Sequence, residues 1–390
     1  MNAKKIKTVV LYSTPAYGHI NPVLSVLAEL SRSGSRIIFY STTEFEIHAQ
    51  SCGAEFRSYD LGEITFDTSV GSRLPELSEL ILKFTCRVID GLIEEVNMLK
   101  PDLIIFDTLA FWGRAAAEKC GIISMSVNTL ITVPGMFSKT SMMYTRRFSI
   151  SSIAQMNYLF SLDKYRRQLK KKFPGMDCGT IDILMNKAVL NVYTYPRILH
   201  PDEKKLGKEH FFLGPSSVIR SESAADSERI TGDNLVYASL GTVFFRNEKF
   251  WHRLVDEFGS SKYTLVISSS FLFGRIDQLN LPDNIMVRNY VDQKYMLKNS
   301  ILFITAGGMN SLCEAAAFKV PCLIVPQQGE QGINAAVFEK YGLGRKLDSG
   351  KSIMQQGEKL ICEYSPDEKT TEQFRRVRLT ELLDLLNRLI

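Results

Sequence analysis

Short apolar runs alternate with segments of helical periodicity through most of the chain. In the first half, apolar runs at residues 8–13, 36–41 and 54–59 predict strands, and the segments 20–33 and 44–52 between them predict helices. The loops that join these elements are short. Repeated strand, helix and strand units with short connections predict a parallel sheet covered by helices on both faces.

The same alternation extends the first sheet and then starts again in the second half. Residues 102–106 and 122–127 predict two further strands, with a helix at 110–120 between them. Because 390 residues exceed the size at which one core usually stops growing, we expect an α/β protein with two parallel-sheet domains. The predicted strands of the second sheet are 235–239, 263–268, 285–289, 301–305 and 322–325.

Proline, glycine and polar residues separate the two halves. They concentrate at 201–234, which predicts a linker between an N-terminal domain at 1–200 and a C-terminal domain at 235–367. A last helix is predicted at 368–390, where leucines recur at helical spacing. Periodicity alone leaves open whether this helix packs back on the first domain or only on the second.

The regular alternation fades between residues 128 and 187, and a basic run occupies 164–172. A segment that interrupts a regular fold is usually a substrate-facing excursion or a surface cover. In one interpretation the basic run contacts a membrane surface or an acidic acceptor, and in the other it is the solvated face of a helix. We favour the solvated helix.

Composition narrows the classes of function. The net charge of +5 argues against a dedicated nucleic-acid binder, whose basic residues concentrate on one face. Seven cysteines are scattered without a CxxC pair, which is typical of reduced thiols in a cytoplasmic protein. Neither a signal peptide nor an apolar run of membrane-spanning length is recognised, so no integral membrane segment is expected. These features give no indication of an oligomeric state.

A strand that turns on glycines into a helix predicts an anion site in the second half. The strand at 301–305 is followed by Gly307 and Gly308 and then by a helix. The first amides of such a helix have no partner within it and carry the positive end of its dipole, so they favour a phosphate. Asn310 and Ser311 add short polar side chains at the same end.

Two neighbouring loops extend this predicted anion site. The turn at Gly241 and Thr242 offers further amides and a hydroxyl. Because the chain has no Asp-x-Asp pair to hold a metal, we expect amides and hydroxyls to bind a diphosphate here, without a metal or a cofactor. The polar loop 326–331 follows the strand at 322–325 and would lie beside the first turn in a parallel sheet. It could hold what is attached to the diphosphate.

His19 and Asp107 are the predicted acid–base pair. Each lies at the carboxyl end of a predicted strand, where open α/β sheets keep their ligands. His19 begins a helix, whose positive end favours the neutral, basic imidazole, and a carboxylate such as Asp107 would orient the ring. The alternatives are that His19 caps the helix and that Asp107 is the N-cap of the helix from Ala110 onward.

The stretch 289–347 carries an ordered set of motifs. It resembles the donor-sugar signature of the nucleotide-sugar-dependent glycosyltransferases of the GT-B fold, particularly the bacterial macrolide and natural-product type. The resemblance covers nearly the whole chain, weakly between 129 and 187. The matching features are Gln293, the GGMNS run with Glu314 after it, Val-Pro-Gln at 325–327, Glu330-Gln331, Asn334-Ala335 and the Gly-Leu-Gly at 342–344.

This resemblance implies two Rossmann-like domains that face each other, with the active site in the cleft between them. It implies that His19 is the catalytic base and that Asp107 is its partner, since both positions match the family pattern. It also implies that Glu314 binds the ribose hydroxyls. Glu330 and Gln331 would bind the hydroxyls of the sugar, a task that suits carboxylate and amide groups.

The resemblance also assigns a site for the nucleotide base and shows two departures from the family. The base would lie against Gln293, the backbone near Val291 and Tyr290. Tyr290 stands where the family commonly has a tryptophan and would stack through a smaller face. Ala306 stands where the family usually has a histidine that contacts the diphosphate, so that contact must come from other groups.

The resulting hypothesis is an inverting glycosyltransferase. It would move a hexose from a nucleotide diphosphate sugar, with UDP the favoured nucleotide, to a hydroxyl of a small hydrophobic acceptor such as a macrolide, a polyketide or a phenol. The nucleotide sugar would be a co-substrate and no other cofactor is expected. Two alternatives stay open at this point: a sugar-nucleotide-binding protein with impaired catalysis, and a sugar-nucleotide epimerase of the same fold.

Overall fold

The structure is a computed structural model, and the chain divides into two compact units. The first unit comprises Met1–Ser217 and Val377–Ile390, and the second comprises Val218–Arg376. The described residues are 5–390 apart from 63, 65–73, 132–152, 177, 180–182, 185, 201–202, 220–229, 231–233, 242–247, 276–279 and 328.

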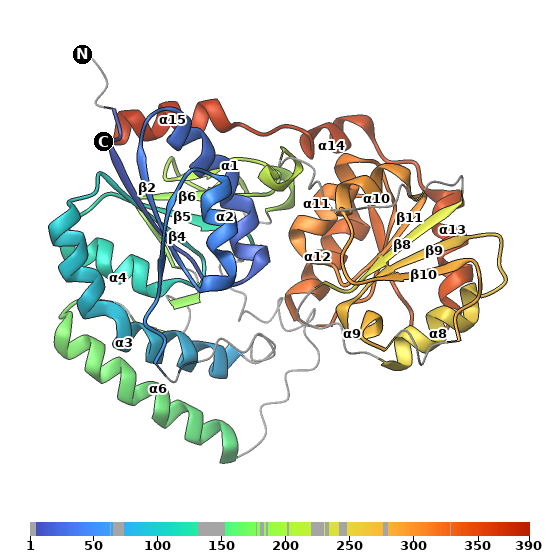
Figure 1. Cartoon of the computed structure of the whole chain (residues 1–390), viewed down its shortest axis with the longest axis horizontal. Coiled ribbons are helices and arrows are strands. Elements are labelled where there is room, and N and C mark those ends of the chain that lie inside the picture. The colour runs from blue at the N-terminus through green and yellow to red at the C-terminus, as the bar shows by residue number, and fades with distance from the viewer. Residues whose placement is uncertain are drawn as a thin grey trace. The chain divides into compact units, whose positions relative to one another are not determined.

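The first unit is built on a parallel sheet of seven strands in the order β3-β2-β1-β4-β5-β6-β7. Figure 1 labels β2, β4, β5 and β6 of this sheet. Strands β2 and β3 lie on one side of β1, and strands β4 to β7 lie on the other side. The order therefore reverses between β1 and β4. The strands are β1 (Thr8–Tyr12), β2 (Arg36–Ser41), β3 (Glu55–Ser58), β4 (Leu103–Asp107), β5 (Ser124–Asn128), β6 (Leu190–Tyr193) and β7 (His210–Phe212).

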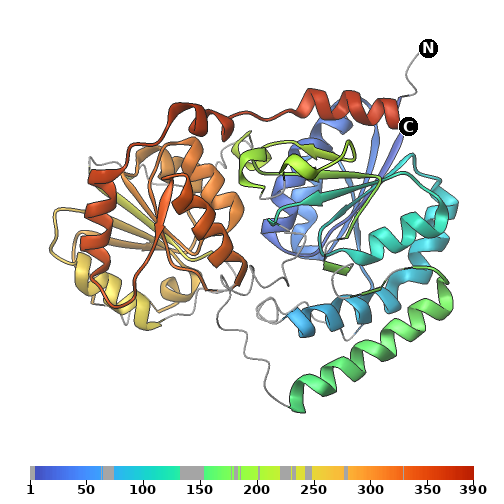
Figure 2. The same ribbon diagram turned by 180° about the vertical axis from the view of Figure 1, so that it is seen from behind.

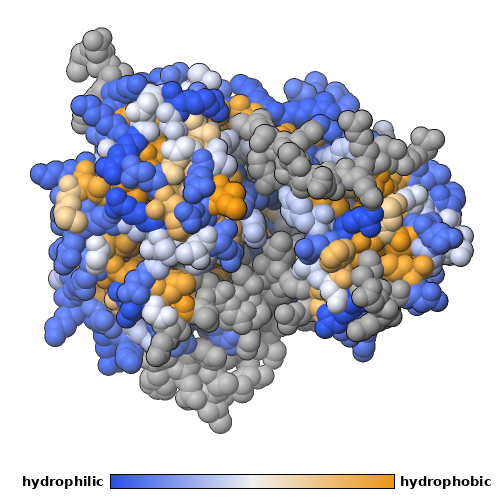
Figure 3. Space-filling view, viewed as in Figure 1, coloured by the Kyte–Doolittle hydropathy of each residue, from blue (hydrophilic) through white to orange (hydrophobic). Residues whose placement is uncertain are grey.

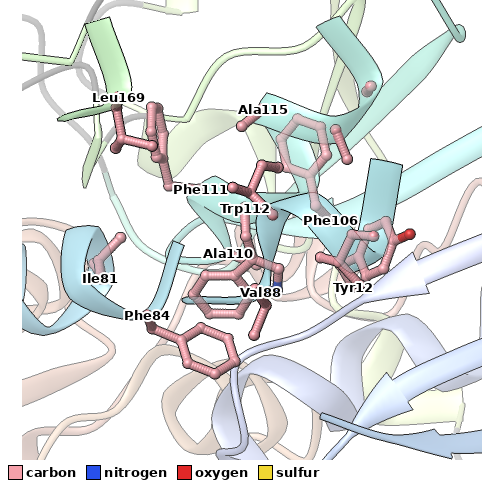
Figure 4. Close-up of a cluster of buried hydrophobic side chains, with 14 of the residues drawn as sticks. Tyr12, Ile81, Phe84, Val88, Phe106, Ala110, Phe111, Trp112, Ala115 and Leu169 are labelled. Atoms are coloured by element: carbon pink, nitrogen blue, oxygen red, sulfur yellow. The ribbon is translucent and has the colours of Figure 1, made fainter. Parts of the chain in front are cut away.

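Helices cover both faces of this sheet, as the alternation of elements predicts. They are α1 (Tyr17–Arg32), α2 (Glu46–Ser51), α3 (Leu74–Leu99), α4 (Phe111–Cys120), α6 (Ile153–Lys172) and α15 (Leu379–Leu389), with short 3-10 turns at Thr43–Phe45 and Arg197–Leu199. Because successive side chains of a strand point to opposite faces, the residues of β1 divide between two cores. Val9 and Leu11 pack with α1 and α15, whereas Val10 and Tyr12 pack with α3, α4 and α6. Figure 4 shows part of the second core, including Phe84 of α3 and Trp112 of α4.

The C-terminal segment is two helices, not the one helix predicted at 368–390. α14 (Glu368–Gln373) belongs to the second unit, and α15 belongs to the first. Leu382 and Leu386 of α15 are fully buried in the core beneath α1. In Figures 1 and 2 the red helix α15 lies beside the blue elements of the first unit. The packing question that periodicity left open is therefore answered by the apolar face of α15.

The segment predicted as a linker from residue 201 begins too early. Residues 203–219 form two 3-10 turns, Glu203–Lys205 and Ser216–Ile219, with β7 between them. β7 pairs in parallel with β6, and Leu213 just after it is fully buried. A strand of three residues is too short to show a period of two, so the surrounding polar composition concealed it. The first unit thus extends to Ser217 rather than to residue 200.

The second unit repeats the architecture with a six-stranded parallel sheet in the order β10-β9-β8-β11-β12-β13. Its order reverses between β8 and β11. The strands are β8 (Leu235–Ser239), β9 (Thr264–Ser268), β10 (Ile285–Arg288), β11 (Leu302–Thr305), β12 (Cys322–Ile324) and β13 (Gly344–Lys346), and the helices are α8 (Glu248–Phe258), α9 (Ser270–Phe273), α10 (Gln293–Asn299), α11 (Met309–Ala317), α12 (Gly329–Lys340) and α13 (Ile353–Glu363).

The basic run lies on the outer face of α6. Leu162 and Leu169 are buried against the core of the first unit, whereas Lys164, Arg167 and Lys171 are exposed. This is the pattern of a solvated helix face. None of the helices in the described ranges combines the length and hydropathy that a membrane span requires. On the face drawn in Figure 3, hydrophobic residues appear in patches between hydrophilic ones.

We expect Leu386→Ala to destabilise the first unit by about 2 to 5 kcal/mol, because it leaves a cavity where a fully buried leucine was. The chain has two tryptophans, so a Trp251→Phe background leaves Trp112 of the first unit as the fluorescent reporter. Urea unfolding in that background gives the change. Leu389→Ala is the matched control, since Leu389 is 38% exposed. Equal effects of the two substitutions would contradict the packing of α15 described above.

Candidate functional site

His19 lies in the first turn of α1, directly after the loop that follows β1. α1 begins at Tyr17, three residues earlier than the predicted start at 20. The His19 side chain is 14% exposed, so one part of the ring reaches the surface while the rest is enclosed. The helix has Ala16 at its N-cap and no acidic residue in its first turn. The imidazole is thus placed at the positive end of a helix dipole.

Asp107 is the last residue of β4, the strand beside β1. The parallel register pairs Tyr12 of β1 with Phe106 of β4, so the residues that follow each strand emerge at the same edge of the sheet. There Asp107 Oδ1 lies 3.0 Å from His19 Nδ1. This edge is where the strand order reverses, the position at which open α/β sheets form a crevice. The structure therefore brings the predicted acid–base pair together.

Three donors hold the Asp107 carboxylate. It accepts hydrogen bonds from the backbone amide of Thr14, from Thr14 Oγ1 at 3.1 Å and from the backbone amide of Leu109 at 2.9 Å. The side chain is only 2% exposed, so these bonds replace contacts that water would otherwise make. They fix the orientation in which Oδ1 faces the imidazole.

The alternative that Asp107 is the N-cap of α4 does not hold. The N-cap of α4 is Ala110, and the Asp107 carboxylate bonds to the amide of Leu109, before the helix. The backbone carbonyl of Asp107 accepts bonds from Ala110 and from the side-chain amide of Asn186. Asp107 therefore closes the turn between β4 and α4 and orients His19, instead of capping α4.

Thr14 and Asn186 are site residues that the sequence analysis missed. Thr14 lies two residues after the end of β1, and a small polar residue just past a strand end was a usable signal. Asn186 is fully buried with a positive φ of 28°, and it reaches Asp107 from far along the chain. Its side-chain nitrogen lies 3.1 Å from the Asp107 carbonyl oxygen. Nothing in the local sequence around 186 indicates that contact.

The second sheet places three predicted loops side by side. The register opposes Thr305 of β11 to Ser239 of β8 and to Ile324 of β12. The turn at Gly241, the turn at Gly307 and the loop after β12 consequently leave the same edge of the sheet, again where the strand order reverses. Thr242 lies outside the described residues.

Gly307 is required by both conformation and space. Its φ is +92°, a region that other residues rarely adopt. A Cβ atom at this position would lie 2.6 Å from Ile324 Cγ2, well inside van der Waals contact. The side chain of Asn334 donates a hydrogen bond of 2.9 Å to the Gly307 carbonyl and so fixes the turn from α12.

The N-terminus of α11 differs from that of α10 beside it. At α10 the Asp292 carboxylate accepts hydrogen bonds from the amides of Lys294 and Tyr295, so that end is capped by its own chain. At α11 the N-cap is Gly308, which has no side chain to accept such bonds. The N-cap residue of α11 therefore makes no side-chain hydrogen bond to the first amides of the helix. Asn310 lies in this first turn and is partly exposed.

Three predicted donor-binding side chains form one cluster between α10 and α11. Gln293 Nε2 donates to Glu314 Oε2 at 2.6 Å and to Ser311 Oγ at 3.3 Å. Glu314 is 4% exposed, whereas Gln293 and Ser311 are partly exposed. The cluster presents carboxylate, amide and hydroxyl groups together, a combination that can both donate to and accept from hydroxyls of a ligand.

Tyr290 and Val291 precede this cluster in the loop after β10. Tyr290 is 60% exposed, so its ring face is available for stacking. Val291 is buried. An exposed tyrosine ring three residues before Gln293 agrees with the interpretation that this loop receives a flat group with polar edges.

The loop after β12 is held partly by its own predicted site residue. Gln331 Oε1 accepts a hydrogen bond of 2.8 Å from the Gln327 amide, and the Gln331 side chain is buried. Gln331 therefore shapes the loop as well as lying in it. Glu330 is partly exposed in the first turn of α12.

Ala306, the departure from the family pattern, is buried. Only 4% of it is exposed, and it packs in the apolar core of the second unit with Ala238 and Leu240 of the β8 region. The turn is thus filled by apolar contacts at the position where a polar side chain was expected from the resemblance. Any anion bound here would depend on backbone amides and hydroxyls.

Comparisons with known proteins agree with this arrangement. Residues 249–377 match the family described as the glycosyltransferase family 28 C-terminal domain. The chain is 28% identical over 351 residues to the NDP-glycosyltransferase YjiC of Bacillus licheniformis, covering 87% of this chain and 85% of that protein. It is 22% identical over 376 residues to the oleandomycin glycosyltransferase of Streptomyces antibioticus, covering 95% and 86%.

Solved structures show the same fold. A glycosyltransferase of kitacinnamycin aligns with a TM-score of 0.79 at 21% identity and covers 99% of both chains. The calicheamicin glycosyltransferase CalG4 aligns with a TM-score of 0.71 at 19% identity, covering 98% of this chain and 96% of that one. Two parallel-sheet α/β domains of the GT-B type, as predicted, are therefore confirmed.

We expect Gly307→Ala to cost at least about 1 to 2 kcal/mol from the left-handed backbone alone, with a further penalty from the clash with Ile324. Gly308→Ala is the matched control. Its φ is −62° and the added Cβ meets open space, so its loss should stay below about 1 kcal/mol. Urea unfolding of the second unit, followed by Trp251 in a Trp112→Phe background, compares them. Similar losses would contradict the geometry of this turn.

Proposed function

We propose that this chain, which is similar to glycosyltransferases of the natural-product type, transfers a hexose from a nucleotide diphosphate sugar, with inversion, to a hydroxyl of a small hydrophobic acceptor. The observation that carries this proposal is the His19–Asp107 pair at the carboxyl edge of the first sheet. A protein that only stored a sugar nucleotide would have no use for an oriented base.

The proposed step begins at the acceptor hydroxyl. His19 Nε2 takes the hydroxyl proton while the hydroxyl oxygen attacks the anomeric carbon of the sugar. The bond between that carbon and the diphosphate oxygen breaks, and the nucleoside diphosphate leaves with the electron pair. Attack from the face opposite the leaving group inverts the anomeric centre. The proton remains on the imidazole, where the Asp107 carboxylate 3.0 Å from Nδ1 stabilises the positive charge.

On the donor side, the proposal places the diphosphate at the start of α11. Gly308 supplies no side-chain cap to this helix, and the first amides of the helix together with Ser311 would stabilise the charge on the leaving oxygen. This arrangement needs no metal and no cofactor. The turn at Gly241 follows the neighbouring strand β8, and the Gly241 amide donates to Ser239 Oγ at 3.4 Å.

The nucleoside would occupy the cluster between α10 and α11. Tyr290 would stack on the base, the Gln293 side chain and the Val291 backbone would meet its edge, and Glu314 would bind the ribose hydroxyls. The sugar would face Glu330 and Gln331 in the loop after β12. Relatives named as UDP-glucosyltransferases favour UDP, although one similar structure was solved with dTDP.

The proposed base gives the first functional prediction. His19→Ala should leave at most a few per cent of transfer activity and leave binding of UDP unchanged, because the base contacts the acceptor. Asp107→Asn should lose activity on the order of 10²-fold, since it weakens orientation without removing the imidazole. His252→Ala, an exposed histidine of α8, is the control. Full transfer by His19→Ala, measured with an alcohol acceptor, would disprove the assignment.

The proposed donor site gives the second. We expect the purified protein to form a glycoside from UDP-glucose and a phenolic or macrolide acceptor in the presence of EDTA, because helix amides take the place of a metal. Mass spectrometry of the products, with dTDP-glucose run in parallel, identifies the donor. A requirement for added magnesium would refute metal independence, and no glycoside from any donor across a broad acceptor panel would argue for the non-catalytic alternative.

A further inference from the structure

A buried phenol links the loop after β1 to the helix after β4. Trp112 Nε1 of α4 donates a hydrogen bond of 3.0 Å to the Tyr59 hydroxyl. The same hydroxyl donates to the Ser13 carbonyl at 3.1 Å. Tyr59 is 5% exposed and Trp112 is fully buried, so solvent does not compete for either bond.

These two bonds complete a ring of contacts that includes Asp107 of the acid–base pair. Ser13 directly precedes Thr14, whose amide and hydroxyl donate to Asp107, and Asp107 leads into α4, which carries Trp112. The β1 loop and the segment from β4 to α4 are therefore tied twice: directly through Thr14 and Asp107, and indirectly through Tyr59. Two ties fix an orientation that a single tie would leave free to rotate.

Aromatic packing keeps the second tie rigid. The Tyr59 ring packs edge-on against Trp112, with ring centroids 5.8 Å apart, and stacks on Tyr40, with centroids 5.7 Å apart. Phe84 packs edge-on against Trp112 with centroids 4.6 Å apart. Figure 4 labels both Phe84 and Trp112 in this cluster. Burial raises the pKa of Tyr59 well above its ordinary value, so the phenol keeps the proton that it donates to Ser13.

Tyr12 offers a built-in comparison within the same cluster. It is fully buried, its ring centroid lies 5.2 Å from that of Tyr40 in a tilted arrangement, and it directly precedes Ser13 in the chain. Within the described part of the structure, its hydroxyl has no hydrogen-bond partner. Tyr12 and Tyr59 thus share the apolar surroundings, but only the Tyr59 hydroxyl takes part in the ring of contacts that includes Asp107.

We propose that Tyr59 is a positioning residue for the transfer reaction, and that its hydroxyl, supported by Trp112, holds the Ser13–Thr14 loop so that Asp107 stays aligned with His19. This inference rests on the proposed function, because it assigns a role in the same acid–base pair. It adds a residue that lies on neither substrate and acts only through hydrogen bonds.

The test compares Tyr59→Phe with Tyr12→Phe. Tyr59→Phe should lower kcat about three- to tenfold, in line with the loss of neutral hydrogen bonds, with the donor KM unchanged. Tyr12→Phe should keep the wild-type kcat. In an Asp107→Asn background, Tyr59→Phe should lower kcat little further, because the alignment of residue 107 with His19 is already weakened there. Urea unfolding of each variant shows whether it is folded under the assay conditions.

Trp112→Phe gives a second measurement should Tyr59→Phe fold poorly. It removes the indole donor to the Tyr59 hydroxyl and leaves the bond from that hydroxyl to Ser13. Trp112→Phe should therefore lower kcat less than Tyr59→Phe does, again with the donor KM unchanged. Wild-type kcat in both folded variants would overturn the inference. So would equal losses in Tyr12→Phe and Tyr59→Phe, or an undiminished effect of Tyr59→Phe in the Asp107→Asn background.

The outcomes separate this inference from the function on which it rests. Full activity of His19→Ala would overturn the proposed base and the inference together. Loss of activity in His19→Ala, with wild-type kcat in Tyr59→Phe, would overturn the inference alone.

Discussion

The parallel pairing of β1 with β4 is the constraint on which the first half of the site depends. His19 and Asp107 are far apart in the chain, and only the register of these two strands brings their ends to one edge of the sheet. The strand order reverses between them, and the helices that follow lie on opposite faces. α1 packs in one core of the unit and α4 packs in the other. The polar loops at the strand ends therefore remain uncovered by either helix.

The second unit uses the same constraint for a different chemical purpose. Its strand order reverses between β8 and β11, and a turn that only glycine can occupy follows β11. In the first unit the reversal holds ionisable side chains, which suit proton transfer. In the second it places a helix start after a glycine turn, an arrangement that suits binding of an anion. The proposed function thus assigns proton transfer and anion stabilisation to separate sheets of one architecture.

Much of the site is held by the protein's own hydrogen bonds. Thr14 and Leu109 hold Asp107, Gln293 contacts Glu314, and Gln331 holds the loop at Gln327. Groups fixed in this way lose little conformational freedom when a ligand binds, so more of the interaction energy is available for binding and catalysis. The same bonds also limit substitution, because removing one partner leaves a buried polar group without its hydrogen bond.

Local patterns in the sequence determined most of the helices and strands and several of the candidate site residues. Apolar runs located β1 to β5 of the first sheet and β8 to β12 of the second, glycines located the turn at Gly307, and His19 and Asp107 were found from their places at strand ends. These features depend on neighbours in the chain, which is why they can be read from it. The short strand β7 and the division of the last segment into α14 and α15 were not found, because three residues show no period and an apolar helix face does not name its partner.

Only the tertiary structure decided the contacts that join distant segments. The bond from Asn186 to Asp107, the Trp112–Tyr59–Ser13 link and the burial of Ala306 among core residues leave no local trace. Each arises when strands pair and side chains pack across the sheet. Hydrophobic periodicity specifies which face of an element is buried, but the partner across that face is selected by register and shape, and these exist only in the folded chain.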